Sequence, residues 1–174
     1  MFNFKQQIRE IPNWPKEGVN FKDITPLLQN AETFKTLIDE MTAPYESSKI
    51  DKIVVIDARG FLLGTAMAYK LGCGVSLVRK KGKLPYKTIE ESYEKEYGPD
   101  TLAMHADAVT LGEKVLIVDD LMATGGTMQA TVNMVNKLDG KIIGISVVVD
   151  LPFLGGSEKF TQYNFKPLVT YQSE

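Results

Sequence analysis

The stretch Val115–Thr127, VLIVDDLMATGGT, constrains the fold of this chain more than any other part of the sequence. Its first four residues are apolar in a row, as is typical of a strand buried on both faces of a parallel sheet. Two adjacent carboxylates, Asp119 and Asp120, close the strand, and a glycine-rich turn then opens a helix. A buried strand that passes through a short turn into a helix predicts an α/β fold.

The same alternation of strand and helix occurs elsewhere in the chain. Residues 52–57, KIVVID, form a second apolar run closed by an acid, and residues 60–71 predict a buried helix because they are apolar nearly all round. Further strands are expected over 74–78 and 142–149. This order predicts a doubly wound, mainly parallel sheet.

Other segments predict smaller elements or none. We expect an amphipathic helix over 3–11, a one-sided helix over 31–42 and a short strand near 168–171. Two irregular segments, 79–105 and 150–174, leave from the carboxyl ends of predicted strands. Ligands of α/β sheets bind beyond those ends, so both segments are expected to form walls of the site.

The length and composition limit the classes of function. A chain of 174 residues with 44% apolar and 24% charged residues predicts one globular domain, 1–174. The net charge of −2 gives no reason to expect a nucleic-acid or membrane partner. With one cysteine, Cys73, and one histidine, His105, an internal disulfide and a histidine metal site are not expected. Cys73 is interpreted as a small packing residue and His105 as an ordinary strand residue. The chain is expected to be cytoplasmic.

The glycine-rich turn has the features of a phosphate cradle. Glycines let the backbone approach an anion, and the first amides of a helix lack internal partners. It matches neither a Walker loop nor a dinucleotide-binding loop. Carboxylates just before such a turn suit a sugar phosphate, because they can accept hydrogen bonds from the ribose hydroxyls.

The polar insertion separates charges of opposite sign along the chain. Its cations come first, and they are Arg79, Lys80, Lys81, Lys83 and Lys87. Its acids follow, and they are Glu90, Glu91, Glu94 and Glu96. Cations grouped at a strand end suit a pyrophosphate, and we expect residues 80–97 to act as a lid that excludes water.

The cradle closely resembles the phosphoribosyl-pyrophosphate motif of the type I phosphoribosyltransferases. Further motifs resemble the adenine phosphoribosyltransferases of that family, in order: GVNFKDITPLL (18–28), DARGF (57–61), RKKGKLP (79–85), SYEKEYG (92–98) and VDDLMATGGT (118–127). The resemblance implies the type I fold, a hood from about 1–28 and 150–174, and a homodimer. It also implies that adenine and phosphoribosyl pyrophosphate react, with Mg²⁺ carried by the pyrophosphate and not held directly by the protein, to give AMP and pyrophosphate.

The resemblance also implies a role for individual residues. The 5′-phosphate would be held by Ala123, Thr124, Gly125, Gly126 and Thr127, and the ribose by Asp119 and Asp120. The pyrophosphate would be bound by Arg59, Arg79, Lys80 and Lys83. The adenine would be bound by Asn20, Phe21, Lys22 and Leu151, with the backbone of Asn20 and Lys22 reading its edge. Glu96 would meet N7 of the base, and a cis peptide is expected between Asp57 and Ala58.

Two departures from the family pattern stand in the sequence. Lys22 replaces a common arginine, and Asp57-Ala58 replaces a frequent acid-serine pair, which puts hydroxyl contacts there in doubt. The alternatives are a transferase for hypoxanthine and guanine or for orotate, a regulator that binds nucleic acid, and an unrelated α/β hydrolase. The small Ala123 favours adenine over 6-oxopurines. No added DNA-binding segment supports a regulator, and no nucleophile elbow supports a hydrolase.

Overall fold

The computed structural model describes residues 2–95 and 98–173. Its strands are β1 (Arg9–Pro12), β2 (Asn20–Asp23), β3 (Lys52–Ile56), β4 (Gly74–Lys80), β5 (Thr88–Lys95), β6 (Gly98–His105), β7 (Lys114–Met122), β8 (Lys141–Asp150) and β9 (Phe165–Thr170). Its α-helices are α1 (Thr25–Gln29), α2 (Ala31–Thr42), α3 (Arg59–Leu71) and α4 (Gly126–Lys137). Short 3-10 helices span Phe4–Gln7, Ala43–Tyr45, Pro152–Leu154 and Ser157–Phe160. No helix in these described ranges is long and apolar enough to cross a membrane.

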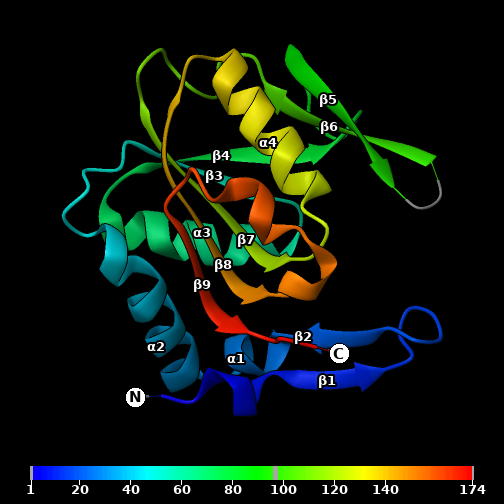
Figure 1. The fold of residues 1–174 in the computed structure, drawn as a ribbon. Helices are drawn as coiled ribbons and strands as arrows, with labels where there is room; N and C mark the ends of the chain where they lie inside the picture. The colour runs from blue at the N-terminus through cyan, green and yellow to red at the C-terminus, as the bar shows by residue number, and fades with distance from the viewer. Residues whose placement is uncertain (1, 96–97, 174) are drawn as a thin grey trace.

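A central seven-stranded sheet has the order β5-β6-β4-β3-β7-β8-β9, and a two-stranded sheet, β1-β2, lies apart from it (Figure 1). Five neighbouring strands of the sheet pair in parallel, and in spatial order they are β4, β3, β7, β8 and β9. Strand β6 pairs antiparallel with both β4 and β5. The predicted α/β fold with a mainly parallel sheet is therefore confirmed. The edges of the sheet are β5 and β9.

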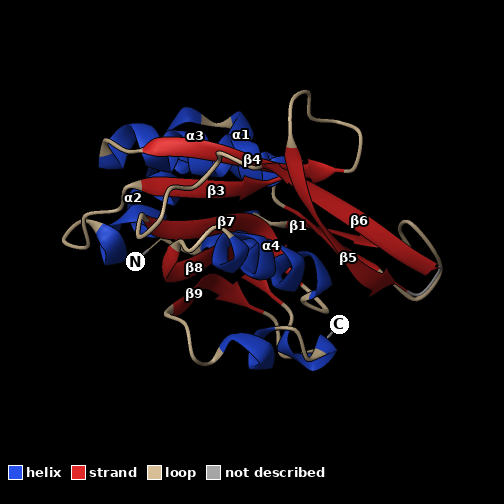
Figure 2. Cartoon of the chain, turned by 90° about the horizontal axis from the view of Figure 1, so that it is seen from above, coloured by secondary structure: helices blue, strands red, loops and turns tan. Residues whose placement is uncertain are grey.

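Alternate residues of the central strands pack into two separate hydrophobic cores, one on each face of the sheet. Along β3, Ile53 and Val55 pack into the core that includes Leu63 and Met67 of α3. Val54 and Ile56 point to the opposite core, which includes α4. Successive side chains of a strand face opposite sides, so a continuous apolar run requires a cover on each face. Helices α3 and α4 supply those covers on opposite sides of the sheet (Figure 2).

The direction of chain winding changes between β3 and β7. From β3 the chain passes through α3 to β4 on one side, whereas β7, α4 and β8 continue on the other side. Two neighbouring connections that leave in opposite directions open a crevice at the carboxyl ends of their strands. The sheet order therefore places the ends of β3 and β7 at the expected position of a ligand site.

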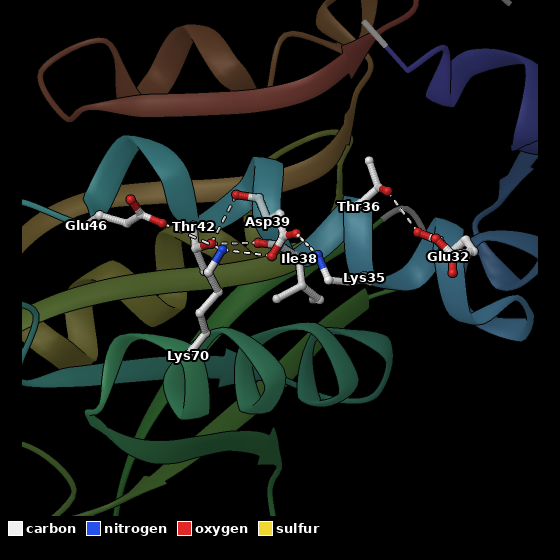
Figure 3. Close-up of polar contacts among 8 residues, drawn as sticks. All are labelled: Glu32, Lys35, Thr36, Ile38, Asp39, Thr42, Glu46 and Lys70. Carbon is white, nitrogen blue, oxygen red and sulfur yellow. Dashed lines mark hydrogen bonds and ion pairs between the residues drawn. The ribbon is translucent and has the colours of Figure 1, made fainter.

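An ion-pair cluster joins α2 to α3 on the surface (Figure 3). Asp39 of α2 accepts hydrogen bonds from Lys35 at 2.8 Å and from Lys70 of α3 at 2.8 Å. Lys70 also lies 3.6 Å from Glu46. Hydrogen bonds from Lys35 and Lys70 lower the pKa of Asp39. The cluster links the solvent-facing sides of the two helices. Exposed ion pairs of this kind add little stability.

Three expectations about local structure are wrong. Residues 3–11 form a 3-10 helix followed by β1, because β1 finds a partner in β2 that a single-sequence pattern does not reveal. Strand β7 runs through Met122, so Asp119 and Asp120 lie within the strand and not after it. The insertion 79–105 is largely a β-hairpin, β5-β6, and not an irregular segment.

The hairpin is attached to α4 by polar contacts. Glu91 of β5 accepts a hydrogen bond from Asn133 at 2.9 Å and pairs with Lys137. These two contacts lower the pKa of Glu91. A charged stretch that appears solvated in the sequence is thus paired across the fold, and Figure 2 shows the hairpin projecting past the carboxyl ends of the parallel strands.

Candidate active site

The phosphate cradle forms the turn from β7 into α4. It lines a cavity of about 290 Å³. The rest of the wall comes from residues 56–59, residues 119–122 and Met128. Gly125 has φ +80°, a left-handed conformation that favours glycine, and α4 begins at the next residue. All five predicted cradle residues, Ala123, Thr124, Gly125, Gly126 and Thr127, line this cavity. Unpaired amides at a helix start make it suited to an anion.

Two carboxylates and one guanidinium line the same cavity as the cradle. Arg59, the first residue of α3, donates a hydrogen bond from Nε to Asp120. The carboxylate of Asp119 accepts from the backbone N–H of Asp120 at 2.8 Å. Burial, and then the negative charge of Asp120, raise the pKa of Asp119 well above its ordinary value. The structure thus brings Arg59, Asp119 and Asp120 together, as the sequence predicts.

The predicted pyrophosphate cations line an adjoining cavity of about 370 Å³. Arg79, Lys80 and Lys83 are among its lining residues, and it shares Asp57, Ala58 and Thr127 with the first cavity. Arg79 donates to Asp57 at 2.8 Å, and Lys80 lies 3.4 Å from Asp100. Cations therefore gather next to the cradle, on the far side of the turn after β3.

That turn contains the expected cis peptide between Asp57 and Ala58. The backbone N–H of Asp57 donates to the carbonyl of Val78 at 3.0 Å, which attaches the turn to β4. A Cβ at Gly60 would lie 3.0 Å from the carbonyl oxygen of Val118, so α3 starts directly against β7. Glycine at this position allows the close approach of the two elements.

The predicted adenine-binding residues come from β2 and from the end of β8. The Phe21 ring lies 5.4 Å from the Arg59 guanidinium carbon, so β2 reaches the crevice. The Lys22 side chain is 1% exposed, its Nζ lies 2.7 Å from Glu10, and it also lies over the ring of Tyr171. The Lys22 side chain is thus taken up by contacts within the protein, and the predicted reading of adenine by its backbone stays a prediction.

The other two adenine candidates have ordinary structural contacts. Asn20 donates from its side-chain amide to Glu10 at 2.8 Å. Leu151, which follows β8, is buried, and its N–H donates to the carbonyl of Met122 at 3.0 Å. Glu96 and Tyr97 lie outside the described residues, so the predicted contact of Glu96 with the base stays a prediction.

Two aromatic residues that are not among the predicted site residues lie beside the site. Trp14 lies edge-on to Phe21 with ring centroids 4.5 Å apart. Tyr93 of β5 lies against the cradle, because a Cβ on Gly126 would be 2.6 Å from its ring and its hydroxyl is 3.3 Å from that of Thr127. The place of Tyr93 depends on how β5 pairs with β6, which the sequence alone does not give.

His105 is a strand residue, as expected, and Cys73 packs against the core on the α3 side. His105 ends β6, and its Nε2 lies 2.6 Å from the carbonyl oxygen of Pro85. Cys73 is partly buried, which raises the pKa of its thiol. Among the described residues, no group of three or more His, Cys, Asp or Glu side chains could hold a metal ion.

Comparison with known proteins identifies the family. Residues 27–166 match the model of the phosphoribosyl transferase domain. The chain is 54% identical to an adenine phosphoribosyltransferase of Brachyspira hyodysenteriae over 167 residues, which cover 96% of this chain and 98% of the relative. The chain belongs to the adenine phosphoribosyltransferase family. It is therefore a phosphoribosyltransferase, an enzyme of the glycosyltransferase class.

Solved structures of the family share the whole fold. The adenine phosphoribosyltransferase of Thermoanaerobacter pseudethanolicus is 46% identical with a TM-score of 0.93, covering 97% of this chain and 98% of that one. The Saccharomyces cerevisiae enzyme is 37% identical with a TM-score of 0.90, covering 95% and 96%, and was solved with adenine and an iminoaltritol bisphosphate. The predicted type I fold is thus confirmed.

The raised pKa of Asp119 predicts a pH-dependent gain in stability for Asp119→Asn. Above its folded pKa, Asp119 is charged in a poorly solvated site. The charge destabilises the folded state, whereas in the unfolded chain the same carboxylate is solvated by water. Asparagine keeps the acceptor oxygen and carries no charge. We expect a higher Tm for the variant at pH 7.5, and a gain that shrinks as the pH falls toward about 4, the ordinary aspartate value.

Thermal unfolding followed by circular dichroism between pH 4 and 8 checks this expectation. Asp107→Asn, at an exposed aspartate, is the matched control and should leave the Tm nearly unchanged. A Tm of Asp119→Asn at or below that of the wild type at pH 7.5 would contradict it.

Proposed function

We propose that this chain transfers the 5-phosphoribosyl group of phosphoribosyl pyrophosphate to adenine, which yields AMP and pyrophosphate. The observation that carries the proposal is the anion cradle at 123–127, which shares one crevice with two carboxylates and an adjoining cation-lined cavity. Family membership supports adenine as the base.

We also propose that the reaction takes place in the cytoplasm. A chain with one cysteine cannot form an internal disulfide and so needs no oxidising compartment, and cell fractionation tests the proposal.

In this proposal the cradle and the carboxylates hold the sugar phosphate. The amides and hydroxyls of Ala123 to Thr127 bind the 5′-phosphate at the start of α4. Asp119 and Asp120 accept hydrogen bonds from the ribose hydroxyls. These carboxylates are poorly solvated in the free protein. The ribose hydroxyls would donate hydrogen bonds to them and so stabilise them when the substrate binds.

The leaving group belongs in the adjoining cavity. Arg79, Lys80 and Lys83 of that cavity, with Arg59 from the first cavity, would stabilise the negative charge that develops on the pyrophosphate as its bond to C1′ breaks. Mg²⁺ would arrive with the diphosphate as part of the substrate. Asp57 and Asp100, which now pair with Arg79 and Lys80, would have to exchange these partners for the diphosphate.

Adenine would bind between the hood strand β2 and the end of β8. Phe21 and Leu151 offer apolar surfaces for the two faces of the ring, and the backbone of Asn20 and Lys22 offers a donor and an acceptor for its amino edge. Trp14 supports the Phe21 ring edge-on. A ring held this way would present N9 to C1′, so that the protein contributes positioning and needs no nucleophile of its own.

We further propose a homodimer, because apolar side chains remain exposed beside one another on one face. Leu62 and Tyr69 lie seven residues apart on α3 and are 54% and 92% exposed, and Leu77 of the adjacent β4 is 38% exposed. Residues seven apart share one face of a helix. Exposed apolar groups gathered in this way mark interaction surfaces.

The dimer proposal predicts a loss of assembly in Tyr69→Glu. A charge at the centre of a buried apolar contact has no partner, so the variant should be monomeric, whereas Tyr69→Phe should behave like the wild type. Light scattering coupled to gel filtration measures the mass directly. A wild-type mass near 19.4 kDa, that of one chain, would refute the proposal.

The proposed reaction is tested by supplying phosphoribosyl pyrophosphate, Mg²⁺ and one free base at a time, and identifying the nucleotide by chromatography. We expect AMP from adenine and at least about a hundredfold lower kcat/KM with hypoxanthine, guanine or orotate, since unpaired polar edges in a buried site are costly. Chelation of Mg²⁺ should abolish turnover. A nucleotide product from another base in preference to AMP would overturn the assignment.

The proposed role of Glu96 predicts a defect in turnover more than in binding. If Glu96 contacts N7 of the base only when the lid closes, Glu96→Gln keeps the shape and removes the charge. The kcat should fall by about tenfold or more, with a smaller change in KM for adenine. Glu94→Gln, at an exposed acid of the same hairpin, is the control. Wild-type turnover in Glu96→Gln would assign Glu96 to a solvated surface instead.

A further inference from the structure

A segment near the C-terminus, Gly155–Phe160, lies directly against the phosphate cradle from outside the cavity. A Cβ placed on Gly156 would be 2.0 Å from the carbonyl oxygen of Ala123 and 2.8 Å from the backbone nitrogen of Gly125. These distances leave no room for any side chain. The two backbones are therefore in contact, although more than thirty residues of chain separate them.

Space and not backbone conformation requires glycine at position 156. Its φ of −70° and ψ of −49° are ordinary right-handed helical values that any residue adopts. Gly125 shows the other side of the same contact, because its Cβ would meet the Gly156 carbonyl oxygen and the Phe160 ring at 3.1 Å each. The fit is close in both directions.

Lys159 adds a polar contact to this fit. Its ammonium donates to the carbonyl oxygen of Thr124 at 2.8 Å. The peptide between Thr124 and Gly125 is planar and trans, so its N–H points opposite to its carbonyl. A cation that holds the carbonyl in one direction thereby sets the direction of the Gly125 N–H, a donor of the cradle.

The segment itself is firmly attached to the protein. Phe160 is fully buried in the core that α4 covers, beside residues such as Met128 and Val147. Asp150, buried at the end of β8, lies near Ser157 of the segment. A rigid support of this kind can fix a loop that contains two glycines and would otherwise lose much conformational entropy on ordering.

We propose that Gly156 and Lys159 are positioning residues that hold the phosphate loop in its anion-binding conformation. The proposal rests on the proposed function, in which that loop binds the 5′-phosphate. Neither residue needs to touch the substrate. Their contribution would appear as affinity for ligands that carry the 5′-phosphate, and not as affinity for the base or the ribose.

The test compares AMP with adenosine, which differ only in that phosphate, as inhibitors of AMP formation. Lys159→Met removes the ammonium and keeps the length of the side chain, and Lys159 is exposed, so the fold should survive. Loss of a hydrogen bond from a charged donor predicts about a tenfold rise in the KM for phosphoribosyl pyrophosphate and in the Ki for AMP. The Ki for adenosine and the KM for adenine should not change.

Three further variants sharpen the result. Lys159→Arg should restore most of the AMP affinity, and Lys166→Met, at another exposed lysine, should behave like the wild type. Gly156→Ala should weaken AMP at least as much as Lys159→Met does. An unchanged Ki for AMP in Lys159→Met, or an equal loss for AMP and adenosine, overturns this proposal. A wild-type protein that forms no AMP overturns the proposed function instead.

Discussion

The ion pair between Arg59 and Asp120 joins the two halves of the parallel sheet at the point where the winding reverses. Arg59 begins the helix that follows β3, and Asp120 lies near the end of β7. Two neighbouring carboxylates in a poorly solvated position repel each other, and the guanidinium in contact with Asp120 offsets part of that repulsion. The close approach at Gly60, the sheet order and the shape of the crevice all serve to bring that cation there.

The phosphate loop is supported from two directions by distant parts of the chain. Residues of the turn after β3 line the same cavity as the loop. The Gly155–Phe160 segment contacts the loop on its side away from the cavity. The hairpin adds a third contact through Tyr93. In the proposed function this loop binds an anion through its backbone, and the shape of such a loop depends on the elements packed around it as well as on its own residues.

The sequence predicted the parts of this molecule that depend on local pattern. Apolar runs located β3, β7 and β8, and the glycine-rich turn located the cradle, because burial and helix-end chemistry leave their mark within a few residues. Pairings between distant segments were not accessible in this way. Strand β1 was interpreted as helix because only its partner β2 decides otherwise, and the contact of Lys159 with Thr124 depends on how β8 and its tail return to the sheet.

The two open edges of the sheet determine how copies of this chain can meet. Edge strands offer unpaired backbone groups to any other strand, which invites uncontrolled addition. Strand β5 carries the acids Glu90, Glu91 and Glu94, and β9 contains Pro167, which has no N–H to donate, beside Lys166. At one edge the charged side chains, two of them held in ion pairs with Lys81 and Lys137, disfavour an added strand, and at the other a missing donor interrupts the ladder. Growth of the sheet from molecule to molecule is thereby disfavoured, which agrees with the proposal that copies of the chain meet through the exposed face of α3 instead.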